Sequence, residues 1–191
     1  HLMNYGDGVY GGMFVAGMYT AAFFESDPVK ILRWGLGCIH PQSDYARLIN
    51  DVLTAHAEGK TWQQAWQILE ENWGQTDSCP DGRNNNLNID AKMNGGYIAI
   101  GLLWGEGDFW QTMNIAMRCG QDSDCNPSNA AGIIGCVCGA SGIPEKWRAP
   151  MQDFIHNFSM QAIYPEKISR MAVVQTTATI GQQVIESVGG K

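Results

Sequence analysis

The chain has 191 residues, and its 12 Lys and Arg residues stand against 19 Asp and Glu residues, which gives a formal net charge of −7. Such a negative chain is repelled by a phosphate backbone, so we expect no nucleic-acid partner. Hydrophobic residues make up 45% of the sequence, yet no apolar run is long enough to span a bilayer, and we expect no membrane partner. The sequence has no signal-peptide pattern, so we expect a cytoplasmic location.

The first part of the chain is predicted to be helical. Residues 8–24 are apolar and rich in small side chains, which favours a closely packed, central helix. This segment overlaps residues 6–11, which match the Gly-x-Gly-x-x-Gly pattern of dinucleotide-binding turns. That pattern requires a preceding strand and a βαβ context, so a tight helix entry is the better interpretation. Capping residues and helix breakers predict further helices over residues 28–38, 44–58 and 62–73. The expected starts are Asp27 with Pro28, Ser43 or Asp44, and a capping box at residues 61–64.

A polar stretch interrupts this pattern. Residues 75–92 are rich in Asn, Asp, Gly and Pro and are predicted to form a long loop, either functional or disordered. Asn94 is expected to cap a helix that runs to Trp104, and Asp108 to cap another that runs to Cys119. The remaining predicted helices cover residues 128–139, 147–157 and 167–188.

The acidic turn, which we define as residues 119–127, is the most informative stretch. It carries Asp122 and Asp124 two positions apart, after a glycine and before a predicted helix. Carboxylate oxygens are the donors that Mg²⁺, Mn²⁺ and Ca²⁺ prefer. Asn126 is the expected N-cap of that helix and Pro127 its first residue. The alternative is that the two carboxylates only complement the positive end of the helix.

The six cysteines are predicted to be small packed residues. Four of them lie between residues 119 and 138, which leaves a cysteine metal site open as an alternative. However, the chain has no Cys-x-x-Cys pair, and Cys136 and Cys138 point to different sides of a predicted helix. A chain of this size has no need of disulfides for stability.

The acidic turn also resembles the signature of a family. Residues 120–126, the small-residue helix after them and the Ile-Pro-Glu-Lys-Trp segment at residues 143–147 resemble the ADP-ribosylglycohydrolase family, and so do residues 102–108. The resemblance runs over residues 6–147 and leaves residues 148–191 outside.

The resemblance implies an all-α fold, an orthogonal multi-helix bundle of the ADP-ribosylglycohydrolase type. We expect residues 1–191 to form a single helical domain. The matching motifs belong to the C-terminal half of the family domain, so the chain is expected to lack the N-terminal part. A segment of the same fold that supplies this part is therefore an expected partner.

For the site, the resemblance implies Mg²⁺ or Mn²⁺ as cofactor, with two ions in a complete site. Asp122 and Asp124 match metal-ligand positions of the family and are the expected catalytic pair. Cys125 stands where the family often has a Thr whose hydroxyl is a metal ligand, and a thiol is a poor partner for Mg²⁺. The family also uses a Thr/Ser-Asp-Asp run, which occurs nowhere in this chain.

The expected substrate-binding residues are Asn94, Gly95 and Tyr5. In the family, the segment before the Leu-Leu-Trp-Gly motif faces the nucleotide, which implies Asn94 and Gly95. Tyr5 falls near a position where family members often carry a ligand-facing His. The alternative for Asn94 and Gly95 is a helix cap followed by a packing glycine.

The resemblance implies a metal-dependent hydrolase of ADP-ribosyl or related ribosyl glycosidic linkages. The expected partner is an ADP-ribose-type small molecule or an ADP-ribosylated protein. Divalent ions can grip the ribose hydroxyls and position a water at the anomeric carbon, where an oxocarbenium-like transition state forms. The alternative is a non-catalytic helical binding or structural domain with an incomplete metal site, which the missing Thr/Ser-Asp-Asp run favours.

Overall fold

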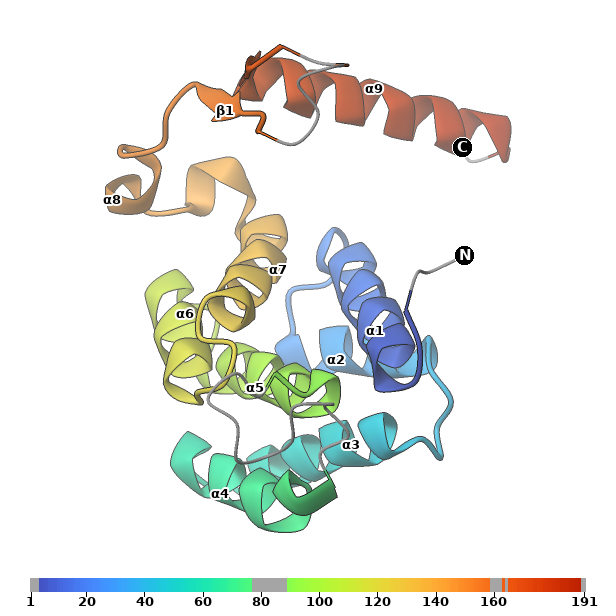
Figure 1. Cartoon of the computed structure of the whole chain (residues 1–191), viewed down its shortest axis with the longest axis vertical. Coiled ribbons are helices and arrows are strands. Elements are labelled where there is room, and N and C mark those ends of the chain that lie inside the picture. The colour runs from blue at the N-terminus through green and yellow to red at the C-terminus, as the bar shows by residue number, and fades with distance from the viewer. Residues whose placement is uncertain (1–3, 77–88, 159–162, 164, 190–191) are drawn as a thin grey trace. The chain divides into compact units, whose positions relative to one another are not determined.

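The computed structural model describes residues 4–76, 89–158, 163 and 165–189 (Figure 1). The chain divides into two compact units, residues 1–144 and residues 145–191. We had expected a single domain, and the division lies close to the point where the sequence motifs end. Each unit is described below by itself.

The first unit is a bundle of helices, as predicted for an all-α fold. Its elements are α1 (Asp7–Ala22), α2 (Pro28–Gly37), α3 (Asp44–Ala57), α4 (Trp62–Asn72), a short 3₁₀ helix η1 (Gly74–Thr76), α5 (Ala91–Trp104), α6 (Phe109–Arg118) and α7 (Cys125–Gly142). The tight helix entry predicted near residue 6 is confirmed, because α1 begins directly after Gly6. Of the predicted polar loop, residues 77–88 lie outside the described part of the chain.

Side-chain caps fix the starts of several helices, as the sequence predicted. The Asp27 carboxylate accepts a hydrogen bond from the N–H of Val29, and Pro28 follows at the first helical position. The Ser43 hydroxyl caps α3 in the same way. Thr61 and Gln64 form the predicted capping box at the start of α4. Local sequence signals therefore determine where these helices begin.

Two helix starts differ from the prediction. α5 begins at Ala91 and is capped by Asp90, whose Oδ1 accepts a 2.9 Å hydrogen bond from the N–H of Met93. Asn94 therefore lies within the first turn of the helix. Likewise α7 begins at Cys125 and is capped by Asp124, which leaves Asn126 inside the helix and 1% exposed. In both cases an Asp placed earlier takes the cap, and the Asn turns its side chain into the protein.

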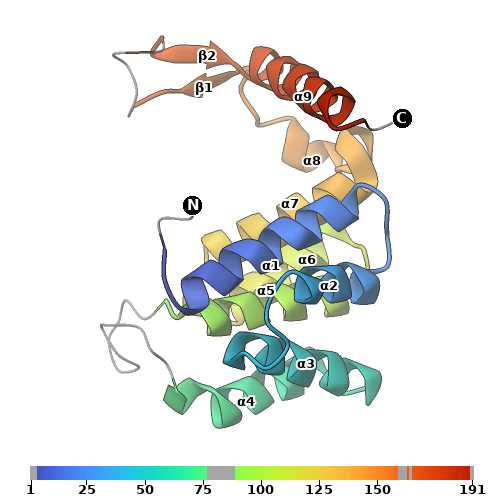
Figure 2. The same ribbon diagram turned by 90° about the vertical axis from the view of Figure 1, so that its right-hand side faces the viewer.

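The centre of the first unit is α5. Every residue from Lys92 to Leu103 is buried, and the helix contacts α1, α3, α4, α6 and α7. Figure 2 shows it between α1 and α3. Gly96 faces the side chains of Leu48 and Leu69, with no room for a side chain of its own. Gly96 thus allows α3 and α4 to approach α5 closely.

The second unit contains a short helix, a hairpin and a longer helix. These are α8 (Glu145–Arg148), β1 (Phe154–His156), β2 (Lys167–Ser169) and α9 (Arg170–Ser187). β1 and β2 pair antiparallel, with Phe154 opposite Ser169. No helix in the described part of the chain is both long and apolar enough to cross a membrane.

The prediction of a helix over residues 147–157 was wrong. Pro150 has no backbone N–H and ends the helical segment soon after α8. The residues after it form β1 instead, and the N–H of Asn157 donates to the carbonyl of Glu166 across the hairpin at 2.7 Å. The last predicted helix, residues 167–188, is confirmed except that its first three residues belong to β2.

The capping box of α4 gives a direct test of how these helices are specified. We expect Thr61→Ala to lower the free energy of unfolding by about 1 kcal/mol, because the N–H of Gln64 loses its acceptor. Urea denaturation followed by circular dichroism measures the loss. Thr54→Ala is the control: Thr54 lies inside α3 and bonds only the carbonyl one turn earlier, so its removal should change stability by less than about 0.5 kcal/mol. Equal losses for the two variants would contradict this account.

Candidate active site

The acidic turn joins α6 to α7 with an unusual backbone. Gly120 has a φ of 97° and Gln121 a φ of 50°, so two consecutive residues occupy the left-handed region. Glycine adopts that region without steric cost, whereas a Gln there must be held by its surroundings. The N–H of Ser123 donates to the carbonyl of Gln121 at 2.9 Å and tightens the turn. The chain thereby reverses within a few residues and brings both aspartates to the start of α7.

The structure brings the three predicted metal-ligating residues together. One ligand atom each from Asp122, Asp124 and Cys125 lies within 4.8 Å of the others. The backbone N–H of Cys125 donates to Oδ1 of Asp124 at 3.0 Å and to Oδ1 of Asp122 at 3.3 Å. Both carboxylates are therefore drawn to the positive end of α7. Asp122 is half-buried, and Asp124 and Cys125 are exposed.

The protonation preferences of these groups differ. The neighbouring Asp122 carboxyl group and the N–H of Cys125 hold the pKa of Asp124 below its usual range. The hydrogen bond and the negative charge of Asp122 raise the pKa of the Cys125 thiol. At neutral pH the cluster therefore offers an ionised Asp124 beside an uncharged thiol. Hard oxygen donors dominate it, as the sequence predicted, and Cys125 is the weakest of the three candidate ligands for Mg²⁺.

Asn94 lies directly behind the acidic turn and is 8% exposed. Its Oδ1 accepts hydrogen bonds from the N–H of Asp122 at 3.1 Å and from Nδ2 of Asn126 at 2.7 Å. Its Nδ2 donates to the carbonyl of Asp90 and to Oε1 of Gln121, both at 2.9 Å. All four hydrogen-bonding positions of the amide are thus filled from within the protein. The expected role of Asn94 in substrate binding has to be revised, because nothing remains for a ligand to bond.

Gly95 and Tyr5 were the other two expected substrate-binding residues. Gly95 is buried, and the hydroxyl of Tyr45 occupies the space that a side chain at this position would fill. The structure therefore makes Gly95 a packing residue instead of one that a ligand approaches. Tyr5 precedes α1 and is 78% exposed, so its ring is open to a ligand.

A buried charge cluster lies next to these residues and was not anticipated. Lys92 is 1% exposed, and its Nζ lies 3.3 Å from Oδ2 of Asp90 and 3.9 Å from Oδ2 of Asp7. It also donates to the carbonyl of Thr76 at 2.9 Å. Burial raises the pKa of Asp7, and the charge of Lys92 opposes that rise. In the sequence, Asp90 and Lys92 lie in the polar stretch and Asp7 lies at a helix entry. No local sequence pattern marks these residues as buried.

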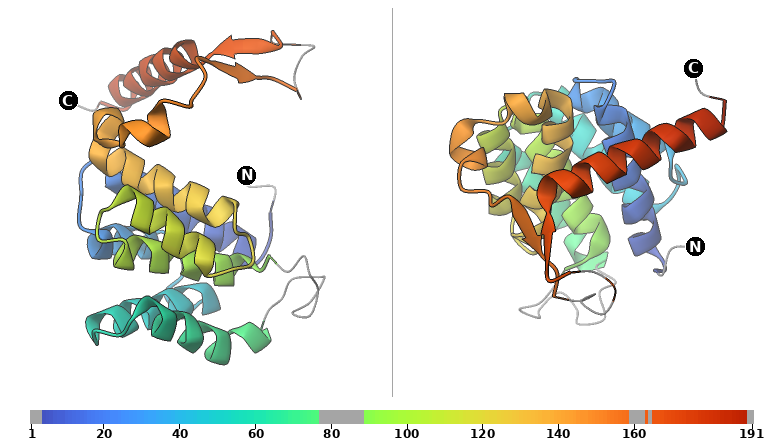
Figure 3. Two further views of the ribbon diagram at one scale, coloured as in Figure 1. Left: turned by 90° about the vertical axis from the view of Figure 1, so that its left-hand side faces the viewer. Right: turned by 90° about the horizontal axis from the view of Figure 1, so that it is seen from above.

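Through these contacts three helix starts come together. Lys92 links the start of α1 to that of α5, and Asn94 links α5 to the acidic turn at the start of α7. Figures 2 and 3 show these helix ends on the same side of the unit. The candidate site is therefore built where α1, α5 and α7 begin.

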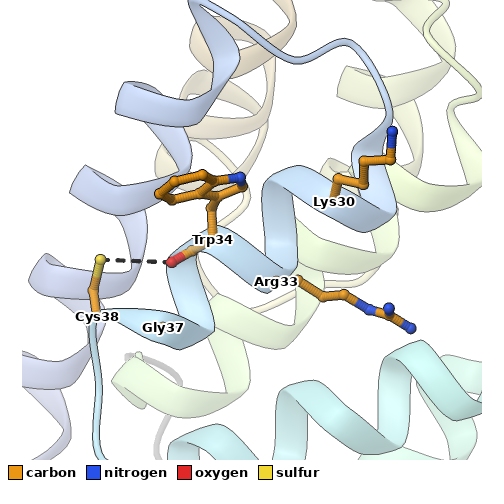
Figure 4. Close-up of a pocket in the computed structure, with 5 residues that line it drawn as sticks. All are labelled: Lys30, Arg33, Trp34, Gly37 and Cys38. Carbon is orange, nitrogen blue, oxygen red and sulfur yellow. Dashed lines mark hydrogen bonds between the residues drawn. The ribbon is translucent and has the colours of Figure 1, made fainter.

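Two cavities lie elsewhere in the first unit. One, of about 410 Å³, lies on α2 and is lined by residues that recur along one helix (Figure 4): Lys30, Arg33, Trp34, Gly37 and Cys38. In Figure 4 the Arg33 side chain extends away from Trp34, so the polar groups do not converge. The other, of about 560 Å³, is an apolar groove along α7 that also includes Phe23 and Phe109. Neither contains a residue of the acidic turn before α7.

The tight packing around Gly95 gives a stability prediction, and Gly37, which lies in open space, provides the control. We expect Gly95→Ala to destabilise the chain by about 1–3 kcal/mol, because the new methyl group collides with Tyr45 inside the core. Gly37→Ala on α2 meets no atom within 4 Å, so it should be neutral or stabilise by about 0.5 kcal/mol. Thermal unfolding of the two variants measures both effects. A Gly95→Ala variant as stable as the unmodified chain would contradict the packing role.

The family match extends further than the motifs in the sequence. No curated protein and no solved structure matches the chain. The family model described as ADP-ribosylglycohydrolase matches residues 1–179, and so includes most of the segment after residue 147 that we had placed outside the resemblance. Because this match covers most of the 191 residues, the chain belongs to the ADP-ribosylglycohydrolase family.

Proposed function

We propose that this chain acts in the metal-dependent hydrolysis of ADP-ribosyl or related ribosyl glycosidic linkages. Family membership supports a glycohydrolase-like function. The observation that carries the finer proposal is the convergence of Asp122, Asp124 and Cys125 within 4.8 Å at the start of α7. The proposed substrates are an ADP-ribose-type small molecule or an ADP-ribosylated protein.

The donor set fits a hard divalent cation. Asp122 and Asp124 would hold Mg²⁺ or Mn²⁺, since both ions prefer carboxylate oxygens. When bound, such an ion polarises the ribose hydroxyls and a water molecule that it orients. Two carboxylates fill only part of an octahedral shell, so the affinity for the metal alone is expected to be modest. Cys125 is an uncharged thiol at neutral pH and adds little to the affinity for a hard ion.

The residues of the chain supply charge and orientation. The pKa of Asp124 lies below the usual range of a carboxyl group, so Asp124 is ionised at neutral pH. Its negative charge would stabilise a positively charged, oxocarbenium-like centre. Asp122 is half-buried, and its backbone N–H donates a hydrogen bond to Oδ1 of Asn94, which holds it in place. Tyr5, exposed before α1, offers an aromatic surface for the adenine or the ribose of the substrate.

The second candidate function is a non-catalytic helical domain that retained the fold. The sequence feature in its favour is the absence of a Thr/Ser-Asp-Asp run from the 191 residues. In such a domain the acidic turn would bind a cation or a ribose without cleaving the glycosidic bond.

Metal and ligand binding can be tested together by isothermal titration calorimetry. We expect ADP-ribose to bind in the presence of Mg²⁺, and we expect the Asp122→Asn/Asp124→Asn double variant to weaken this binding by more than about tenfold, since it removes both anionic ligands. Glu58→Gln/Glu71→Gln is the matched control, because it removes two negative charges from exposed positions on the C-terminal ends of α3 and α4. Identical heats for the unmodified chain and the Asp122→Asn/Asp124→Asn variant would refute the proposed site.

Turnover separates the two candidate functions. We expect the chain to release ADP-ribose from ADP-ribosyl-arginine or ADP-ribosyl-serine peptides in the presence of Mg²⁺, and we expect EDTA to abolish the release. Chromatography of the released nucleotide measures the rate. Metal-dependent binding of ADP-ribose without release from either peptide would favour the non-catalytic domain.

A further inference from the structure

We infer that Asn94 is a positioning residue for the acidic turn. Its side-chain amide, carried by the buried helix α5, fixes the backbone from which Asp122 and Asp124 project. This inference rests on the proposed metal site and adds a residue that touches neither metal nor substrate. Three steps support it.

The first step is that the amide has one possible orientation. Its Oδ1 faces two donors, the N–H of Asp122 and Nδ2 of Asn126. Its Nδ2 faces two acceptors, the carbonyl of Asp90 and Oε1 of Gln121. A flipped amide would set donors against donors and acceptors against acceptors, inside a region where unpaired polar groups are costly. Asn94 therefore has a fixed rotamer and a fixed set of partners.

The second step is that these partners hold the acidic turn at several points. Asn94 accepts a hydrogen bond from the backbone N–H of Asp122 and donates one to the side chain of Gln121. Asn126, held by the same Oδ1, also donates from Nδ2 to the carbonyl of Gly120 at 3.4 Å. The carbonyl of Asp122 accepts from the N–H of Asn126 at 3.0 Å. The peptide units on both sides of Asp122 are thus tied down.

The third step is that the amide stands on a rigid base. Asn94 lies in the first turn of α5, whose residues from Lys92 to Leu103 are all buried. The cap of that helix, Asp90, is itself held by the ammonium group of Lys92. Tight packing on all sides restricts the movement of such a helix. The acidic turn, which includes a non-glycine residue in the left-handed region, is therefore attached to a helix that is buried along nearly its whole length.

Two simpler roles for Asn94 do not fit. It is not the helix cap, because Asp90 caps α5. It is not a substrate ligand, because all four hydrogen-bonding positions of its amide are occupied. Asn94 is therefore left with a supporting role for the carboxylates of the acidic turn. In known metal sites, mutation of such a supporting residue lowers the metal affinity roughly 10–100-fold.

The test compares Asn94→Ala with Ile100→Ala. Ile100 lies on the same helix and is completely buried, so its truncation costs stability without touching the acidic turn. Mn²⁺ is the probe, and its affinity is measured from the electron paramagnetic resonance signal of the free ion, under conditions where each variant is folded. We expect Asn94→Ala to raise the Mn²⁺ dissociation constant roughly 10–100-fold and Ile100→Ala to change it by less than about twofold.

A second measurement reports on the clamp without any metal. Hydrogen exchange by NMR follows the backbone amide of Asp122, which Asn94 protects. We expect Asn94→Ala to accelerate this exchange by at least about tenfold relative to Ile100→Ala. Asn94→Asp keeps both acceptor contacts and loses both donor contacts, so its Asp122 amide should exchange more slowly than in Asn94→Ala. Should Asn94→Ala fail to fold, Asn94→Leu provides the test, because its side chain has a similar volume and no hydrogen-bonding group.

The outcomes separate this inference from the proposed function. If the unmodified chain binds Mn²⁺ and folded Asn94→Ala binds it equally well, the positioning role is overturned while the metal site stands. Unchanged exchange of the Asp122 amide in folded Asn94→Ala, or in Asn94→Leu, overturns the clamp itself. If the unmodified chain binds no Mn²⁺, the proposed metal site falls, and the positioning role falls with it.

Discussion

The structure of the first unit depends on the burial of α5 from Lys92 to Leu103. A helix surrounded on all sides can leave no polar group at its start without a partner, because no water reaches it. The first turn of α5 nevertheless carries Asp90, Lys92 and Asn94, all of them buried. Lys92 finds partners in η1 and at the start of α1, and Asn94 finds them in the acidic turn. Asp90 accepts hydrogen bonds from Met93 and Lys92 within α5. The need to satisfy these groups draws three helix starts to one place.

Burial of Lys92 is the costly part of this arrangement. A charged group loses its hydration when it enters the protein, and the attraction of nearby opposite charges offsets that loss only in part. Asp90 and Asp7 supply the opposite charges and the carbonyl of Thr76 a further acceptor. Removing one partner of such a buried pair costs roughly 3–5 kcal/mol. The cluster therefore favours one arrangement of α1 and α5 over alternatives, which suits a site that needs defined geometry more than added stability.

Much of the fold could be predicted because it follows from local signals. The caps Asp27, Ser43 and Thr61 act on residues two or three positions away, and those helices begin where the sequence indicated. The predictions failed where two capping residues stood close together. Asp90 competes with Asn94, and Asp124 with Asn126, and tertiary contacts decide which side chain is free to cap.

The candidate site likewise combines local features that the sequence predicts with long-range contacts that it does not. Asp122 and Asp124 are two residues apart and could be paired from the sequence, whereas the contact of Asn94 with Asp122 spans 28 residues.

The filled amide of Asn94 also has a consequence for how this family can diverge. Asn94 bonds Gln121 on one side and Asn126 on the other, so a change at Asn94 leaves a polar group on each of them without this partner. A single substitution at one of these positions is therefore expected to cost stability unless its partners change with it. Coordinated replacement of the three side chains among homologues is the trace that this interdependence would leave.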